Sequence, residues 1–324
     1  MTLSLVLSAC GSQPSPASSG SEAPSKLPEV RLGLSTWIGF APLFVAKEKG
    51  FFEKEGASVD LLLMEGVAER RSALAAGKIQ GFVSTVDTHV VTAASGVPVV
   101  QVLALDDSYG GDGIVALKEI QSLRDLVGRK VAVQTDGGAS YFWFLYLLEK
   151  EGISPSEIQF QSMTAGDAGA AFVAGKVDAA VTWQPWLSRA EKTTFGHVLL
   201  KSDATPGVIA DTLAMRKDFV ENHPEAVRAI VAAWFDALDH IEANPEESYV
   251  IMAKAMGVTP EEFQSQLSDI RWYDRAMNQA YFGTPEKPGP LYDLTAMAAS
   301  FWKRQGLIEK EPEAKDLIDG AFLP

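Results

Sequence analysis

VRLGLSTWIGFAPLFVAKEKGFFEKEGASVDLLLM, residues 30–64, is the stretch that decides the fold. Residues 30–34 and 58–64 are short runs rich in aliphatic side chains, which favours two strands. Between them, residues 41–52 carry a helical pattern that we expect to end near Gly50. A strand, a helix and a second strand in succession are typical of a mainly parallel sheet covered by helices.

The same alternation continues to residue 183. We expect further strands at 81–83, 99–105, 114–117, 130–134, 158–162 and 179–183, and helices at 68–76, 87–95, 120–126, 140–151 and 168–174. Between two of these strands, residues 106–113 are polar and glycine-rich, and we expect a loop there. The last part should be helical, at 223–243, 245–256, 260–270, from 276 onward and at 291–305. The sequence therefore predicts an α/β fold.

Length and charge exclude several classes of protein. The 324 residues are enough for two α/β lobes, each with its own core. A hydrophobic share of 47% and a mean hydropathy of +0.04 are typical of a soluble globular chain. The net charge of −14, from 28 basic and 42 acidic residues, disfavours a nucleic-acid partner because phosphate binding needs clustered basic side chains.

The single cysteine, Cys10, follows a short apolar run and the residues Leu7-Ser8-Ala9, which match a bacterial lipobox. We therefore expect residues 1–10 to be a lipoprotein signal peptide and Cys10 to carry the lipid. Residues 11–28, rich in Ser, Pro, Gly and Ala, should form a flexible tether. These features predict an extracytoplasmic protein anchored by lipid to the cell membrane, in the periplasm or on the outer face.

Polar and aromatic side chains follow the predicted strands, where open α/β sheets bind their ligands. The candidate ligand-binding residues are Trp37, Glu65, Ser84, Asp87, Asp107, Asp112, Ser140, Asp167, Trp183 and Gln184. Each has a plainer explanation. Asp87, Ser140 and Asp167 stand where helix N-caps are expected, the two tryptophans could fill the core, and Glu65 could start a turn. Three carboxylates at residues 106–112 repel one another unless they are solvated or face a cation, so at least one should contact the ligand.

Known catalytic motifs for phosphate binding, nucleophilic serine or zinc are not found in the sequence, and its four histidines lack metal-ligand spacing. We therefore predict neither an enzyme, a cofactor nor a metal site. An acidic cleft with tryptophans suits a cationic or donor-rich planar solute, such as a guanidinium, amidine or urea compound. A sulfonate or nitrate would instead need basic side chains or helix N-termini.

Several stretches together resemble the nitrate/sulfonate/taurine-type, or NMT1/THI5-like, periplasmic binding proteins. They are GLSTWIGFAPLFVAKEKGFFEKEG at 33–56, residues 74–77 and 84–87, GDGIVA at 111–116 and DAAVTWQPW at 178–186. The resemblance covers residues 30–310. One departure is Gln184, because the family commonly has Trp-Glu-Pro-Trp at this motif.

The resemblance implies a type II periplasmic-binding-protein fold that closes on its solute by hinge bending. Lobe 1 would comprise 29–112 and 208–324, and lobe 2 would comprise 113–207. The solute would lie between the rings of Trp37 and Trp183, and the monomeric chain would deliver it to the permease and ATPase subunits of an ABC importer. Alternatives are taurine, alkanesulfonate or nitrate as the solute, and a THI5-like protein that handles a pyrimidine or another heterocycle. A regulator's effector domain shares the fold but would carry a helix-turn-helix in place of the tether.

Overall fold

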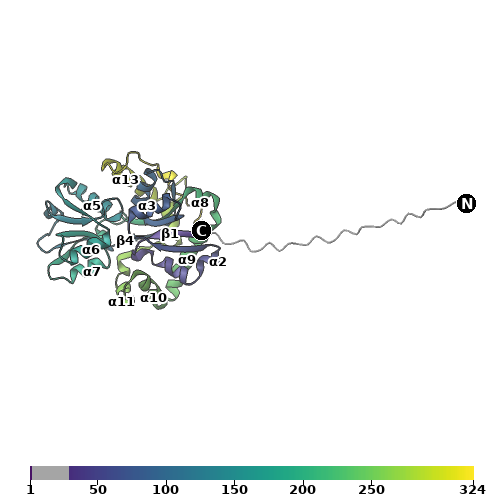
Figure 1. Ribbon diagram of the computed structural model, residues 1–324, viewed down its shortest axis with the longest axis horizontal. Helices are drawn as coiled ribbons and strands as arrows, with labels where there is room; N and C mark the ends of the chain where they lie inside the picture. The colour runs from purple at the N-terminus through teal and green to yellow at the C-terminus, as the bar shows by residue number, and fades with distance from the viewer. Residues whose placement is uncertain (2–28) are drawn as a thin grey trace.

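The computed structural model describes Met1 and residues 29–324, and these residues form two sheets (Figure 1). Six strands make the first sheet, in the order β11-β4-β10-β3-β1-β2. Their bounds are β1 Glu29–Leu34, β2 Ser58–Leu63, β3 Gly81–Thr85, β4 Val99–Ser108, β10 Ala210–Arg216 and β11 Ile270–Trp272. The strands β1, β2 and β3 are parallel, whereas β10 runs antiparallel to both β3 and β4.

Five strands make the second sheet, in the order β7-β6-β8-β5-β9. Their bounds are β5 Asp112–Leu117, β6 Lys130–Val133, β7 Gln159–Ser162, β8 Ala179–Trp183 and β9 Gly196–Lys201. The chain passes from the first sheet to the second between β4 and β5 and returns between β9 and β10. We call the first sheet with its helices lobe 1 and the second sheet with its helices lobe 2.

Helices cover both sheets (Figure 1). The sheets are mixed rather than mainly parallel as predicted, because five of the nine strand pairs among the described residues are antiparallel. Lobe 1 holds α1 Pro42–Glu48, α2 Phe51–Glu55, α3 Val67–Ala75, α4 Val86–Ala94, α8 Lys217–Asn222, α9 Pro224–Ala243, α10 Pro245–Met256, α11 Pro260–Ser265, α12 Arg275–Phe282 and α13 Pro290–Arg304. Lobe 2 holds α5 Ala139–Lys150, α6 Ala165–Val173 and α7 Trp186–Glu191. Short 3₁₀ helices are η1 Ile38–Phe40, η2 Leu123–Leu126, η3 Pro155–Glu157, η4 Ser202–Ala204, η5 Leu267–Asp269 and η6 Ala314–Asp316.

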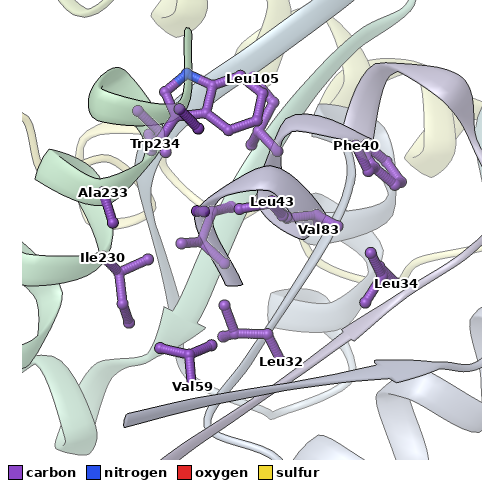
Figure 2. Close-up of a cluster of buried hydrophobic side chains, with 14 of the residues drawn as sticks. Leu32, Leu34, Phe40, Leu43, Val59, Val83, Leu105, Ile230, Ala233 and Trp234 are labelled. Carbon is purple, nitrogen blue, oxygen red and sulfur yellow. The ribbon is translucent and has the colours of Figure 1, made fainter. Parts of the chain in front are cut away.

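The core of lobe 1 lies between the sheet and α1 and α9. Figure 2 shows Ile230, Ala233 and Trp234 of α9 turned toward Leu43 of α1 and the strand residue Leu32. Trp234 is fully buried, and burial of a side chain of this kind stabilises the fold by about 1.5–3 kcal/mol. This packing makes the sheet a rigid support for the loops at its edge.

A second apolar cluster joins the two lobes. It combines Phe142 and Trp143 of α5 with Val90 of α4 and with Phe301 and Trp302 of α13. This explains why residues 141–148 are hydrophobic all round: α5 is covered by its own sheet on one side and by lobe 1 on the other.

The predicted α/β class and the periplasmic-binding-protein fold are confirmed. The helix expected from residue 41 ends near Gly50 as predicted, because Gly50 adopts a left-handed φ of 70°, but the short helix α2 after it was not expected. Three element predictions are wrong. The helix expected at 260–270 ends at Ser265 in α11, and η5 and the start of β11 follow it. Residues 120–126 form only the 3₁₀ helix η2. The loop expected at 106–113 is largely strand, since β10 and β11 pair with β4 on both sides as far as residue 108.

In the described residues we find no helix with both the length and the apolar character needed to cross a bilayer. The predicted signal peptide, the tether and the lipidation site Cys10 lie outside the described residues.

Candidate functional site

A cavity lies where the ends of strands from both sheets meet. It measures about 460 Å³, with the open solvent at its mouth included. Lobe 1 supplies most of its wall, and lobe 2 supplies the start of α5 and the facing ends of β5 and β8. The lining residues are Ser35, Trp37, Phe40, Val67, Arg70, Ser84, Thr85, Asp112, Gln134, Gly137, Gly138, Ala139, Ser140, Trp183, Ile209 and Asp211.

Three helices begin at this cavity. Val67 is the first residue of α3, Thr85 is the N-cap of α4, and Gly138 is the N-cap of α5. Gly138 needs a positive φ of 103°, and a Cβ there would lie 3.0 Å from the side chain of Val67 in the other lobe. Helix N-termini present free N–H groups and partial positive charge, so this wall favours an anionic group.

Arg70 adds a full positive charge to the same wall. Its side chain is 3% exposed. One guanidinium nitrogen, Nη1, donates to the carbonyls of Met64 at 2.5 Å and Glu65 at 3.3 Å, while Nε has no partner. Burial lowers the pKa of Arg70 to about 10, so the group stays charged at neutral pH. Within the part of the chain that the structure describes, no carboxylate lies within ion-pair distance of it.

Acidic side chains also lie at the cavity. Asp112 and Asp211 line the cavity, and Asp106 lies beside Asp211 on the neighbouring strand. All three are at least 96% buried. Burial raises the pKa of Asp112 to about 7, and burial together with the neighbouring carboxylates raises the pKa of Asp106 and Asp211 well above the usual range. A cationic group in the cavity would relieve this repulsion and favour the ionised forms.

Two tryptophans, one from each lobe, line the cavity and pack edge to face, so this arrangement leaves no room for a solute between the two rings, where the resemblance implied that it would lie. The ring centroids of Trp37 and Trp183 lie 6.4 Å apart in an edge-to-face arrangement. Nε1 of Trp37 donates to Oδ1 of Asp106 at 2.8 Å, which fixes the ring, and Oδ2 of Asp106 has no partner. Such rings provide apolar surface for a methylene chain or a face for a cation.

The structure brings together five of the ten candidate residues. Trp37, Ser84, Asp112, Ser140 and Trp183 line the cavity. The hydroxyl of Ser140 is buried without a partner.

The other five candidates do not line the cavity. Glu65 accepts from the backbone N–H of Thr36 at 3.1 Å. Asp87 lies behind the wall, where it accepts from Nε1 of Trp302 at 3.2 Å, and burial raises its pKa to about 6. Asp107 forms a bidentate ion pair with Arg271, at 3.1 and 2.5 Å.

Asp167 lies at the start of α6, where its carboxylate accepts from the Thr164 hydroxyl at 2.8 Å. Gln184 donates from Nε2 to Oδ2 of Asp269 in lobe 1 at 2.8 Å. The N-cap explanation for Asp87, Ser140 and Asp167 is also wrong by position, because the N-caps are Thr85, Gly138 and Thr164.

Arg70 and Asp211 are the charged lining residues that sequence reasoning missed. Arg70 lies inside α3 in the run Glu69-Arg70-Arg71, which is typical of a solvated helix face. Asp211 is the second residue of β10, the first strand after the chain returns from lobe 2. Asp211 is a charged residue in an otherwise mostly apolar run, Val208 to Met215, and this pattern could have marked it as a candidate. Among the described residues, no cluster of three or more His, Cys, Asp or Glu could hold a metal ion.

Comparison with known proteins shows the family of the chain. Residues 37–248 match the family model described as NMT1/THI5 like. The chain is 30% identical to the taurine-binding periplasmic protein of Escherichia coli over 277 residues, which is 82% of this chain and 84% of that protein. It is 24% identical to the putative aliphatic sulfonates-binding protein of Bacillus subtilis, over 98% of this chain and 92% of that protein.

Solved structures show the same fold. The alkanesulfonate-binding protein of Xanthomonas axonopodis pv. citri, bound to MOPS, superposes with a TM-score of 0.75 at 17% identity and covers 90% of this chain and 98% of its own. The periplasmic nitrate-binding protein of Synechocystis PCC 6803 gives a TM-score of 0.74 at 18% identity, over 92% of this chain and 87% of its own.

Proposed function

Because this chain belongs to the NMT1/THI5-like family, we propose that it is the solute-binding component of an ABC importer. It captures a small polar solute between its two lobes, 29–112 with 208–324 and 113–207, and presents it to a permease and its ATPase. Binding rather than catalysis fits a cavity lined by charged groups, hydroxyls and helix N-termini.

The observation that carries the choice of solute is the presence of both signs of charge in one buried cavity. Arg70 and the N-termini of α3, α4 and α5 suit an anionic head group. Asp112 and Asp211 suit an ammonium group, and the rings of Trp37 and Trp183 suit the carbons between the two ends. The solute class is therefore a short zwitterion with a sulfonate at one end and an amine at the other, such as taurine.

The relatives support this choice without deciding it. One relative, at 30% identity, carries taurine in its name, and another, at 24% identity, names aliphatic sulfonates. The chain also spans most of the length of both relatives, so its role can be compared with theirs over nearly the whole protein.

A guanidinium-like or urea-like solute is the second candidate. The observation in its favour is the group of three buried aspartates, Asp106, Asp112 and Asp211. A cation alone would satisfy these carboxylates but would leave the Arg70 charge and its free Nε unpaired in the closed cavity. The zwitterion pairs both, which is why we place it first.

The position of the protein follows from the same role. We propose that the chain acts outside the cytoplasmic membrane, as the names of its periplasmic relatives support. The lipobox at Cys10 supports a lipid anchor that keeps the protein close to its importer.

Thermal unfolding of the purified chain with millimolar solutes tests the proposal. The panel is taurine, ethanesulfonate, nitrate, guanidine and urea. A solute at 100 times its Kd should stabilise the chain by about 2.7 kcal/mol, a rise of about 2–4 °C or less for a protein of this size. Taurine should give the largest rise and ethanesulfonate a smaller one. A rise with guanidine or urea alone would replace the zwitterion by the second candidate, and no rise with any solute would contradict the proposed function.

A further inference from the structure

Gln184 lies next to a cavity residue but reaches a different partner. It follows Trp183 directly, its side chain is 4% exposed, and it does not line the cavity. Its carbonyl Oε1 accepts from the backbone N–H and the hydroxyl of Ser188, at 3.2 and 2.9 Å. These two donors identify the carbonyl end of the amide and turn the Nε2 end toward lobe 1.

Two donors from lobe 2 converge on one carboxylate of lobe 1. Nε2 of Gln184 donates to Oδ2 of Asp269 at 2.8 Å, and Nζ of Lys201 donates to Oδ1 at 3.1 Å. Asp269 also accepts, through its backbone carbonyl, from the N–H of Tyr109 at 2.8 Å. Because Tyr109 and Lys201 stand where the chain crosses between the lobes, Asp269 ties both crossings to Gln184.

We propose that Gln184 is a positioning residue for solute binding: its bond to Asp269 holds the lobes in the arrangement that this structure shows and fixes Trp183 against the cavity. This inference rests on the proposed function, since it concerns how long the bound solute is retained. Gln184 would not touch the solute. Its backbone N–H also donates to the carbonyl of Gly111 at 2.9 Å, so Trp183 is held between the ladder to β5 and the bond to Asp269.

This role depends on the neutral amide of Gln184, because this group can donate one hydrogen bond and accept another. Gln184 must donate to Asp269 and accept from Ser188, and an amide can do both. A carboxylate of the same shape at 184 would accept from Ser188 but would face the Asp269 carboxylate without a proton. The charged groups near position 184 are Asp269 on η5, Lys201 on β9 and Arg189 on α7, and Arg189 already pairs with Glu262 at 3.5 Å.

The test is Gln184→Glu, which changes a charge and hardly any volume. Stopped-flow tryptophan fluorescence with taurine, or with whichever solute of the panel binds, should show solute leaving about tenfold faster at pH 8 and entering at nearly the wild-type rate. Acid should restore retention relative to wild type, because the introduced carboxyl can again donate to Asp269 once it is protonated. The double variant Q184E/D269N should also recover retention, since the amide introduced at position 269 can donate to the carboxylate introduced at position 184.

The matched control is Gln264→Glu, which adds the same charge at an exposed site on α11. Solute should leave this variant at the wild-type rate. A correctly folded Q184E chain that releases solute at the wild-type rate at pH 8 overturns the proposal. So does a defect that neither acid nor the double variant relieves, because that pattern indicates general damage.

A solute-free readout separates this proposal from the proposed function. The emission of Trp183, taken as the difference between chains with and without the W183F substitution, should shift in Q184E and not in Q264E. If no solute binds to the wild type, the proposed function fails, and this emission still decides the role of Gln184: a shift supports it, and an unchanged spectrum overturns it.

Discussion

Arg70→Met tests the charged wall of the cavity most sharply. The substitution keeps an unbranched apolar side chain of similar length in α3 and removes the guanidinium. The bound sulfonate should lose at least one hydrogen bond to a charged donor, which contributes about 1.5–3 kcal/mol. This energy corresponds to a Kd about 10 to 150 times higher.

The Arg70→Met substitution should change the stability of the solute-free chain only slightly. Arg70 is buried, burial lowers its pKa to about 10, and it has no carboxylate partner among the described residues. Removing an unpaired buried charge is favourable and offsets the loss of the bonds to the carbonyls of Met64 and Glu65. We therefore expect the free energy of unfolding in urea to change by about 1 kcal/mol or less.

Isothermal titration calorimetry measures the affinity, and urea unfolding measures the stability. The matched control is Arg71→Met, because Arg71 is the next residue of α3, donates to the carbonyl of Asp136 at 2.9 Å and does not line the cavity. The reasoning is refuted if R70M binds a sulfonate within twofold of wild type, or if R70M and R71M lose affinity equally.

The remaining predictions concern the aspartates and the groups that hold them. The pKa of Asp112 is raised from 3.8 to about 7, so its contribution to stability is complete below about pH 4 and is lost as the pH rises to about 7. Asp112→Asn should flatten that part of the curve of unfolding free energy against pH, and an unchanged slope would contradict the buried carboxyl. Trp37→Phe removes the donor at 2.8 Å from Asp106 and should lower the free energy of unfolding by about 2–3 kcal/mol; wild-type stability in urea would show that Asp106 finds another partner. Gly39→Ala would place a Cβ 2.3 Å from the Asp106 carboxyl and should cost about 1–3 kcal/mol in the same assay, whereas a neutral effect would mean that this carboxyl can move.

The alternation of strands and helices could be predicted because it depends on local pattern. Residues 30–64 show this well: the two strands and the helix end near Gly50 were predicted, and only the short helix α2 was missed. The helices at 224–243 and 245–256 begin at prolines, and these local start signals are reliable.

The polar strand ends could not be predicted from local pattern. Asp106 and Asp107 look like loop residues in the sequence because carboxylates are uncommon in strands. They are strand residues because β10 and β11, which come more than 100 residues later, pair with β4 on both sides. Partners so distant in sequence leave no mark on the segment itself.

The candidate site was predicted only in part, for a related reason. Side chains at the ends of strands, such as Trp37, Ser84 and Trp183, were found because strand ends meet at one edge of a sheet. The charge of the cavity was misjudged, because Arg70 reaches the cavity from inside a helix and the loops alone suggested an acidic cleft. Gln184 was expected to contact the solute and instead bonds to Asp269, a partner that only the arrangement of the two lobes reveals.

The most direct test of the account is a calorimetric comparison of taurine with its two halves, ethanesulfonate and ethylammonium, on the wild-type chain. If Arg70 and the helix N-termini bind the sulfonate while Asp112 and Asp211 bind the amine, taurine should bind most tightly. Each half should then bind at least about tenfold more weakly, since each loses a charged hydrogen bond. Tighter binding of guanidine than of taurine, or ethanesulfonate binding as tightly as taurine, would contradict the claim that this cavity selects a zwitterion.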